Sequence, residues 1–181
     1  MFQRRPGGPL RRAFGGDVPP ALRRANQLMA TGQYAAAAEI FEQFARGAVQ
    51  RNGPRAPLFL LQAGQARLHA NQVPAAMAHF LEGFAIIAKR GNFQRLARAG
   101  QRIAAELKER GLTAEAGQIE AYLKSAMPAG FVAAPPAGAA KTRLLPTTCP
   151  GCGGPIRSDE VDWVDEATAE CPYCGSAVRA E

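Results

Sequence analysis

Apolar residues in the first two thirds of the chain follow a pattern with two periods. Within each of three segments they occupy positions i, i+4, i+7, i+11 and i+14, which form one stripe along an α-helix. The same stripe returns twice at a constant spacing along the sequence. The number of residues from Tyr34 to Val73 equals the number from Val73 to Leu112. Its members are Tyr34, Ala38, Phe41, Ala45 and Ala48, then Val73, Met77, Phe80, Phe84 and Ile87, then Leu112, Ala116, Ile119, Leu123 and Ala126. The pattern therefore predicts three equivalent amphipathic helices.

A shorter apolar stripe precedes each of these helices and repeats with it. Its members are Leu22, Ala25 and Met29, then Leu61, Gly64 and Leu68, then Gly100, Ile103 and Leu107. Three helix–turn–helix units, six helices in total, are therefore predicted within residues 17–126. Glycine, asparagine and other polar residues separate the stripes, and both Gly and Asn tolerate the left-handed conformation that ends many helices. The predicted breaks are Thr31-Gly32-Gln33, Gly53-Pro54, Asn71-Gln72, Gly91-Asn92 and Arg110-Gly111.

The first unit carries a recognisable family signature. Residues 32–41 read Gly-Gln-Tyr-Ala-Ala-Ala-Ala-Glu-Ile-Phe and resemble the glycine–tyrosine–alanine–aromatic signature of the tetratricopeptide repeat family. The third unit departs from it, with Glu115 at the small position and Ile119 at the aromatic one. The usual repeat of about 34 residues is also shorter than the interval seen here. The resemblance implies a solenoid of three helical hairpins, and a compact helical bundle built from the same hairpins is the alternative.

The resemblance also implies a binding groove lined by the first helix of each pair. Asn26 occupies a position where the family often uses asparagine to hold a peptide backbone, and Gln65 is its counterpart in the second unit. Leu22 stands where a clamp for a peptide carboxylate would require lysine, so such a clamp is not expected. Ordinary core packing is the alternative role for the groove residues.

The helical periodicity ends near residue 126, and the composition changes there. Residues 127–146 form an Ala/Pro-rich linker, which prolines make partly stiff. Residues 147–181 contain short apolar stretches, in which Val161 and Trp163 alternate with acidic residues, as in a β-strand. At the other end, residues 1–16 are rich in Gly, Pro and Arg, and we expect a disordered basic tail.

The last segment holds every cysteine of the chain, with the spacing C-x2-C-x18-C-x2-C. The four are Cys149, Cys152, Cys171 and Cys174. Each pair is followed by a glycine, which suits a tight turn with positive φ. Two such turns can place four thiolates around one tetrahedral Zn²⁺ at about 2.3 Å. A closed four-thiolate site has no open position for water, so the zinc is expected to be structural.

Residues 147–181 resemble the zinc-ribbon family on these cysteines and their glycines. The resemblance implies a small β module of knuckle, hairpin, knuckle and strand, and it implies no catalysis. Iron in a rubredoxin-like site and redox-active thiols or disulfides remain as alternatives. Trp163 is the single tryptophan. It either covers the knuckles or is an exposed anchor for a partner.

Charge is distributed unevenly along the chain. The net charge is +7, yet residues 149–181 contain two arginines against seven acidic residues. Four thiolates on a divalent cation would make this segment still more acidic. An acidic ribbon repels nucleic-acid phosphates and can instead dock on the basic helical body. Two independently solvated surfaces are the alternative.

The sequence contains no phosphate-binding loop and no local Ser–His–Asp or Cys–His grouping, so we expect no enzymatic activity. No apolar run approaches the roughly 20 residues of a membrane span. Cysteines without a secretion signal are typical of the cytoplasm. We therefore expect a mainly α, cytoplasmic scaffold or adaptor that binds a protein partner. The alternative is an RNA- or DNA-associated regulatory factor that uses the basic tail and the helical body.

Overall fold

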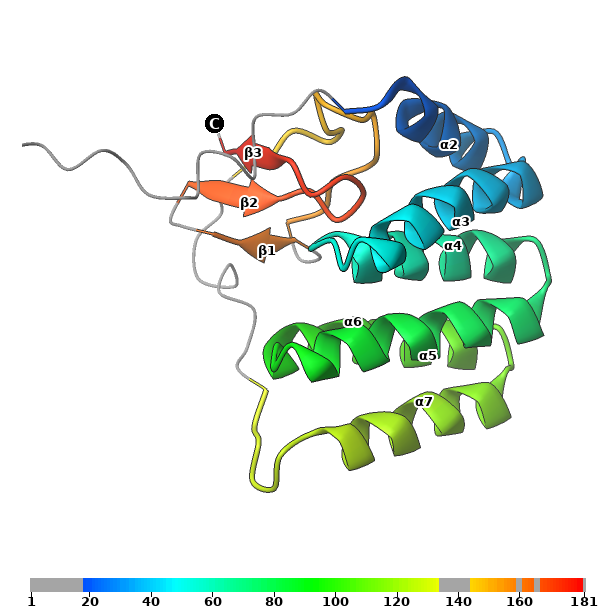
Figure 1. Cartoon of the computed structure of the whole chain (residues 1–181), viewed down its shortest axis with the longest axis vertical. Coiled ribbons are helices and arrows are strands. Elements are labelled where there is room, and N and C mark those ends of the chain that lie inside the picture. Colours follow the sequence, from blue (N-terminus) through cyan, green and yellow to red (C-terminus); the bar gives the residue numbers. More distant parts are fainter. Residues whose placement is uncertain (1–17, 134–143, 159–160, 165–166, 181) are drawn as a thin grey trace, which may run out of the picture.

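The computed structural model describes residues 18–133, 144–158, 161–164 and 167–180. The described chain is mainly α, with six helices followed by a small antiparallel sheet (Figure 1). The helices are α2 (Pro20–Ala30), α3 (Tyr34–Gln50), α4 (Ala56–His69), α5 (Val73–Lys89), α6 (Phe93–Glu109) and α7 (Thr113–Ala126). The strands are β1 (Asp162–Trp163), β2 (Thr168–Glu170) and β3 (Ala177–Arg179). The predicted basic tail, residues 1–16, lies outside the described residues.

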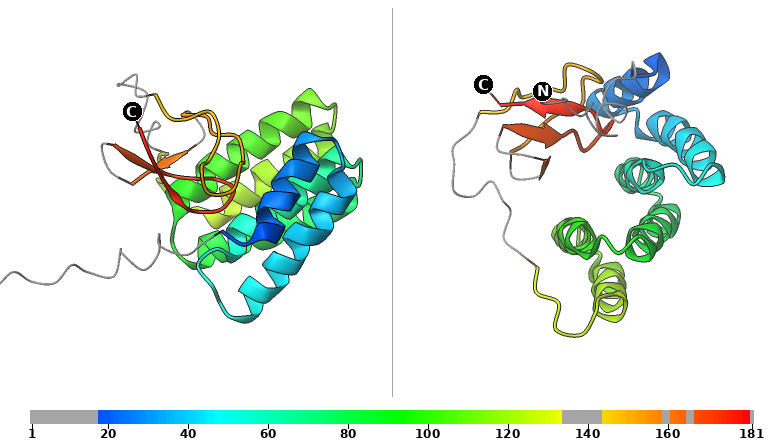
Figure 2. Two further views of the ribbon diagram at one scale, coloured as in Figure 1. Left: turned by 90° about the horizontal axis from the view of Figure 1, so that it is seen from above. Right: turned by 60° about the vertical axis from the view of Figure 1, so that its left-hand side comes forward.

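The helices pack mainly against their neighbours in sequence, as antiparallel pairs joined by short turns. In the right-hand view of Figure 2 they follow an arc from α2 to α7. The small sheet belongs to the C-terminal segment from residue 147 onward, here named the ribbon, and lies beside the start of that arc. All five predicted breaks fall between observed helices. Gly32, Asn71, Gly91 and Gly111 adopt positive φ, the left-handed conformation expected at these ends.

The predicted apolar stripes form the core of the helical part. Phe41, Phe80 and Ile119, which are equivalent in the three units, are each completely buried. Gly64, a member of the stripe on α4, allows α4 and α5 to approach closely, because a Cβ there would lie 2.5 Å from the ring of Phe80. Equivalent positions of the repeated sequence are therefore buried in each of the three units.

The sheet is small and regular. Its order is β1-β2-β3, with both pairings antiparallel. Trp163 pairs with Ala169, and Ala169 pairs with Val178. Ala169 and Val178 are buried, as is Val161 just before β1, whereas Val164 just after it is exposed. The strands of two or three residues provide little core of their own.

Two clusters of buried residues run through the molecule. One joins the helical part from α4 to α7. The other joins α2, α3 and α4 to the ribbon, and it includes all four cysteines with Ile156, Val161, Ala169 and Val178. The ribbon therefore packs on the helices and shares a core with them. No helix in the described part of the chain is long and apolar enough to cross a membrane.

Candidate metal centre and the helical face that covers it

The four cysteines converge on one point. Their sulfur atoms all lie within 4.8 Å of one another, and all four residues are buried. The Sγ atoms of Cys149 and Cys174 are 3.7 Å apart, and those of Cys152 and Cys171 are 3.8 Å apart. A tetrahedron with metal–sulfur bonds of about 2.3 Å has edges of about 3.8 Å. The donor set therefore fits one tetrahedral metal ion, and the cysteines are free rather than disulfide-bonded.

The two knuckles repeat the same backbone hydrogen bonds. Gly153 N donates to Cys149 O at 2.8 Å, and Gly175 N donates to Cys171 O at 2.9 Å. Both glycines have positive φ, as the sequence predicted. Cys149 N donates to Gly154 O and Cys171 N to Ser176 O, each at 2.8 Å. Each loop is thus a closed turn that directs two thiols inward.

The thiols also perturb one another electrostatically. Hydrogen bonds from Cys152, Cys171 and Cys174 lower the pKa of Cys149, because they stabilise its thiolate. Hydrogen bonding to Cys149 and the other thiols raises the pKa of Cys171, and burial adds to this. Four thiols in one pocket cannot all ionise without a cation. A divalent ion held by the four cysteines would remove that limit, because its charge would stabilise all four thiolates.

Side chains of α2 and α4 bind the backbone of the knuckles. Asn26 Nδ2 donates to Cys152 O at 3.1 Å, and Gln62 Nε2 donates to Pro172 O at 3.0 Å. At the edge of the contact, Arg23 Nε donates to Gly151 O at 2.7 Å. The first knuckle is therefore held by α2 and the second by α4.

Both knuckles approach the helical part closely at a glycine. A Cβ on Gly151 would lie 3.1 Å from Val18 Cγ2, just before α2. A Cβ on Gly175 would lie 3.1 Å from Arg55 Nε, just before α4. Such distances are tighter than ordinary van der Waals contact. Glycine at these two positions therefore serves the docking of the ribbon as well as the turns.

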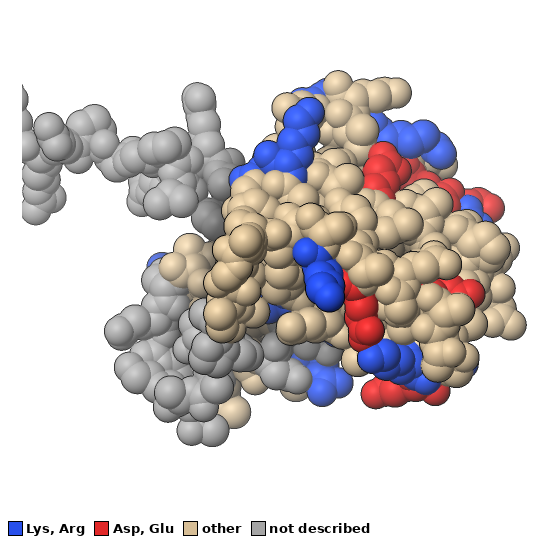
Figure 3. All heavy atoms as spheres, turned by 90° about the horizontal axis from the view of Figure 1, so that it is seen from below, with Lys and Arg blue, Asp and Glu red and all other residues tan. Residues whose placement is uncertain are grey.

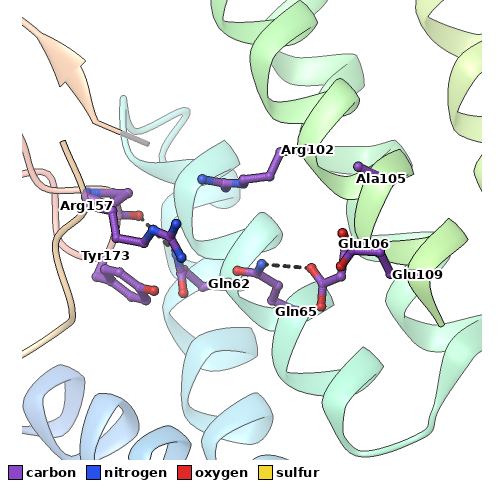
Figure 4. Close-up of a pocket in the computed structure, with 9 residues that line it drawn as sticks. Gln62, Gln65, Arg102, Ala105, Glu106, Glu109, Arg157 and Tyr173 are labelled. Carbon is purple, nitrogen blue, oxygen red and sulfur yellow. Dashed lines mark hydrogen bonds between the residues drawn. The ribbon is translucent and has the colours of Figure 1, made fainter. Parts of the chain in front are cut away.

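A polar cavity of about 320 Å³ lies beside the second knuckle, between α4, α6 and the ribbon (Figure 4). Gln65 on α4 lines it and donates to Glu106 on α6 at 3.2 Å. Arg102 on α6 and Arg157 in the ribbon extend toward each other across the cavity. The helical part and the ribbon thus form one composite surface here.

The residues predicted as sites fall into three places. The four cysteines come together as one cluster. Asn26 does contact a peptide backbone, but one that belongs to the same chain. Gln65 lies at the composite cavity. Trp163 is half-buried and packs against the cluster that contains the cysteines, and its indole N–H has no hydrogen-bond acceptor among the described residues.

Arg23 and Gln62 also contact the knuckles, and the sequence did not predict either contact. A signal for Gln62 exists in hindsight, because it interrupts an apolar run in a helix that is buried on every side from Ala56 to Gly64. An all-apolar helix indicates burial against more than one neighbour. Arg23 carries no such local signal.

Comparisons of the chain with protein-family models, with curated proteins and with solved structures found no match.

Proposed function

We propose that the protein is a non-enzymatic scaffold or adaptor for protein–protein interaction, made of a tetratricopeptide-like helical solenoid and a zinc ribbon with one structural Zn²⁺. The observation that carries the proposal is the closed donor set. Four buried sulfur atoms lie within 4.8 Å of one another, and the two S···S distances of 3.7 and 3.8 Å match the edges of a tetrahedral site. Together the four thiolates would fill the coordination sphere of one ion. A substrate or a reactive water has no position on such an ion.

The metal is proposed to be zinc, and its test is elemental. Tetrahedral thiolate sites accept both zinc and iron. Protein purified under reducing conditions is expected to be colourless and to contain one equivalent of zinc per chain. A coloured preparation with one equivalent of iron would instead indicate an electron carrier.

The partner is proposed to bind where the helical part and the ribbon meet. Gln65 lines the composite cavity with residues from α4, α6 and the second knuckle. A partner that enters the cavity contacts the helical part and the ribbon together. The binding free energies of two modest contacts then combine in one complex and raise the affinity. Polar groups arranged around a concave site are the features by which proteins fix the orientation of a ligand.

Charge supports a protein partner over nucleic acid. On the face seen in Figure 3, acidic and basic side chains are interspersed among uncharged ones. A surface that binds phosphates offers a continuous group of Lys and Arg instead. The cavity itself is lined by both signs of charge, with Arg102 and Arg157 beside Glu106 and Glu109.

Affinity capture from the native cell tests the function. The full chain, loaded with zinc, is compared with Gln65→Ala and with Gln118→Ala, a matched change on the exposed face of α7. Wild type and Gln118→Ala are expected to retain the same protein in near-equal amount, and Gln65→Ala to lose most of it. Retention is expected to survive nuclease and to change little with salt, because hydrogen bonds and charges within a partly buried cavity are screened less than charges on an open surface.

Two results would contradict the proposal. One is capture of nucleic acid that falls steeply with added salt, as counterion release requires. The other is equal capture by all three proteins, which would place the partner elsewhere.

A further inference from the structure

The contacts between the helices and the ribbon recognise the shape of the knuckle backbone. Three side chains of the helices donate hydrogen bonds to main-chain carbonyl oxygens of the ribbon: Arg23 to Gly151, Asn26 to Cys152, and Gln62 to Pro172. None of these three bonds is made to a side chain of the ribbon. The acceptors lie within the two C-x2-C loops, whose thiols converge on the metal centre. One ion held by both loops would fix the positions of these acceptors relative to one another.

Two of the three donors are buried in the contact. Asn26 and Gln62 are 5% and 4% exposed, and they are the buried polar residues of the described core. A buried amide that loses its acceptor is destabilising. Val18, which is buried and lies against Gly151 of the first knuckle, would be uncovered with them. The face of α2 and α4 is thus built to be covered.

We propose that this face is a docking site specific for the metal-loaded knuckles, so that metal binding and closure of the ribbon on α2 and α4 form one linked equilibrium. When the metal leaves, the loops lose the arrangement that the three donors recognise, and the face opens. Linkage is reciprocal, so residues that hold the closed ribbon must also raise the affinity for the metal. Asn26, Gln62 and Arg23 are then positioning residues of the metal site. This inference is independent of the identity of any partner.

Zinc affinity of the full chain tests one direction of the linkage. Competition with a chromophoric chelator is measured for Asn26→Ala and Gln62→Ala, with Gln118→Ala on α7 as the matched amide control. Residues that orient metal ligands typically contribute about 10- to 100-fold in affinity. We expect each buried variant to lose affinity within that range and the control to match wild type.

A second pair of variants keeps this test decisive if a buried change disturbs folding. Arg23 and Arg24 are adjacent and both exposed on α2, and only Arg23 has a hydrogen bond to the knuckle among the bonds the structure records. Arg23→Ala is expected to weaken zinc binding by about 3- to 10-fold, the scale of one hydrogen bond. Arg24→Ala removes the same charge and is expected to leave the affinity unchanged.

Hydrogen exchange tests the other direction. Addition of a chelator to the reduced wild-type chain is expected to accelerate exchange of the amides in α2 and in the first half of α4. The amides of α6 and α7 that face each other should keep their protection. Readdition of one equivalent of zinc should restore the first set. Zinc affinities of all three contact variants within twofold of wild type would overturn the proposal, and so would exchange in α2 and α4 that does not respond to the metal.

Discussion

The helical part and the ribbon reach a defined structure by different physical routes. The helices bury a long apolar series that repeats from one unit to the next, including large side chains such as Phe41, Phe80 and Phe84. The ribbon has strands of two or three residues and buries only a few apolar side chains. So small a core cannot offset the conformational entropy of ordering the segment. The metal and the helical face must supply the rest.

The two parts are therefore sensitive to different kinds of change. The helical part should respond to changes in volume and packing anywhere along its repeat. The ribbon should respond to the loss of a single sulfur atom. Because the two parts share one cluster of buried residues, the effect of the second loss should reach α2 and α4 and fade beyond them.

The largest effect is expected from Cys171→Ser. Metal binding supplies on the order of 10 kcal/mol to the folding of such a module, and a hydroxyl does not replace the thiolate. The ribbon should unfold while most of the helical circular dichroism remains. Trp163, the single tryptophan, lies in β1 and reports the loss as a red shift of its emission.

Ser158→Ala is the control for that variant, since Ser158 is exposed within the same ribbon. It should retain both the metal and the native emission of Trp163. Loss of most of the helical dichroism in Cys171→Ser would show that the helices need the folded ribbon in order to fold.

Phe80→Ala is the corresponding change in the helical part. Phe80 is completely buried at the centre of the repeat. Its truncation is expected to lower the free energy of unfolding by about 3–5 kcal/mol, measured by urea denaturation followed by helical circular dichroism. Leu144→Ala, at a side chain that is 75% exposed, should change it by less than about 0.5 kcal/mol. Equal effects of the two changes would contradict the packing described here.

Gly64→Ala probes the close approach of α4 and α5. The added Cβ would lie 2.5 Å from the ring of Phe80 and 3.2 Å from Ala76 O. Overpacking of this kind costs about 1–3 kcal/mol. Gly117→Ala makes the same change on α7, where nothing lies within 4 Å, and should stabilise the helix by about 0.5–1 kcal/mol. Opposite signs in urea unfolding confirm the prediction, and equal signs would refute it.

The smallest effect is expected from Glu42→Gln. Arg67 contacts both oxygens of Glu42, at 2.6 and 2.8 Å, and His79 lies 3.0 Å from one of them. The hydrogen bond from Arg67 is the main cause that lowers the pKa of Glu42 from its ordinary 4.5. The wild type should exceed the variant in stability by about 1 kcal/mol at neutral pH. Because the folded pKa is depressed, this advantage is present above the ordinary pKa and is lost as the pH falls through the folded value.

The comparison is best made in chelated, reduced protein, so that loss of metal in acid does not contribute. Glu82→Gln, an exposed glutamate on α5, serves as the control. A Glu42→Gln difference that persists undiminished in acid would show that the carboxylate charge is not its cause.

Sequence reasoning located the helices well for a physical reason. The stripe that contains Phe41, Phe80 and Ile119 must face a core, and the turns at Gly32, Asn71 and Gly111 require a left-handed residue. The cysteine cluster was equally predictable from the sequence, because two C-x2-C pairs in one short segment are typical of a single metal site. Both are local patterns in which neighbours along the chain determine the outcome.

The sequence could not decide whether the ribbon docks on the helices, because no local pattern of residues determines that contact. Family resemblance singles out Asn26 as a residue that holds a peptide backbone, and it holds the backbone of Cys152. Gln62 and Arg23 become visible only when α2, α4 and the knuckles are placed together in space. The basic tail and residues 134–143 of the linker lie outside the described residues, so the expectations for them stay predictions.

The most direct measurement is a zinc titration of the reduced, metal-free chain, followed at once by helical circular dichroism and by Trp163 emission. We predict that most of the helical dichroism is present before any zinc is added. The emission should shift to the blue and reach its end point at one equivalent per chain. Two results would contradict the conclusion that the helical part folds by itself and that the metal organises the ribbon. One is helical dichroism that appears only as zinc is added, and the other is a Trp163 emission that does not change with zinc.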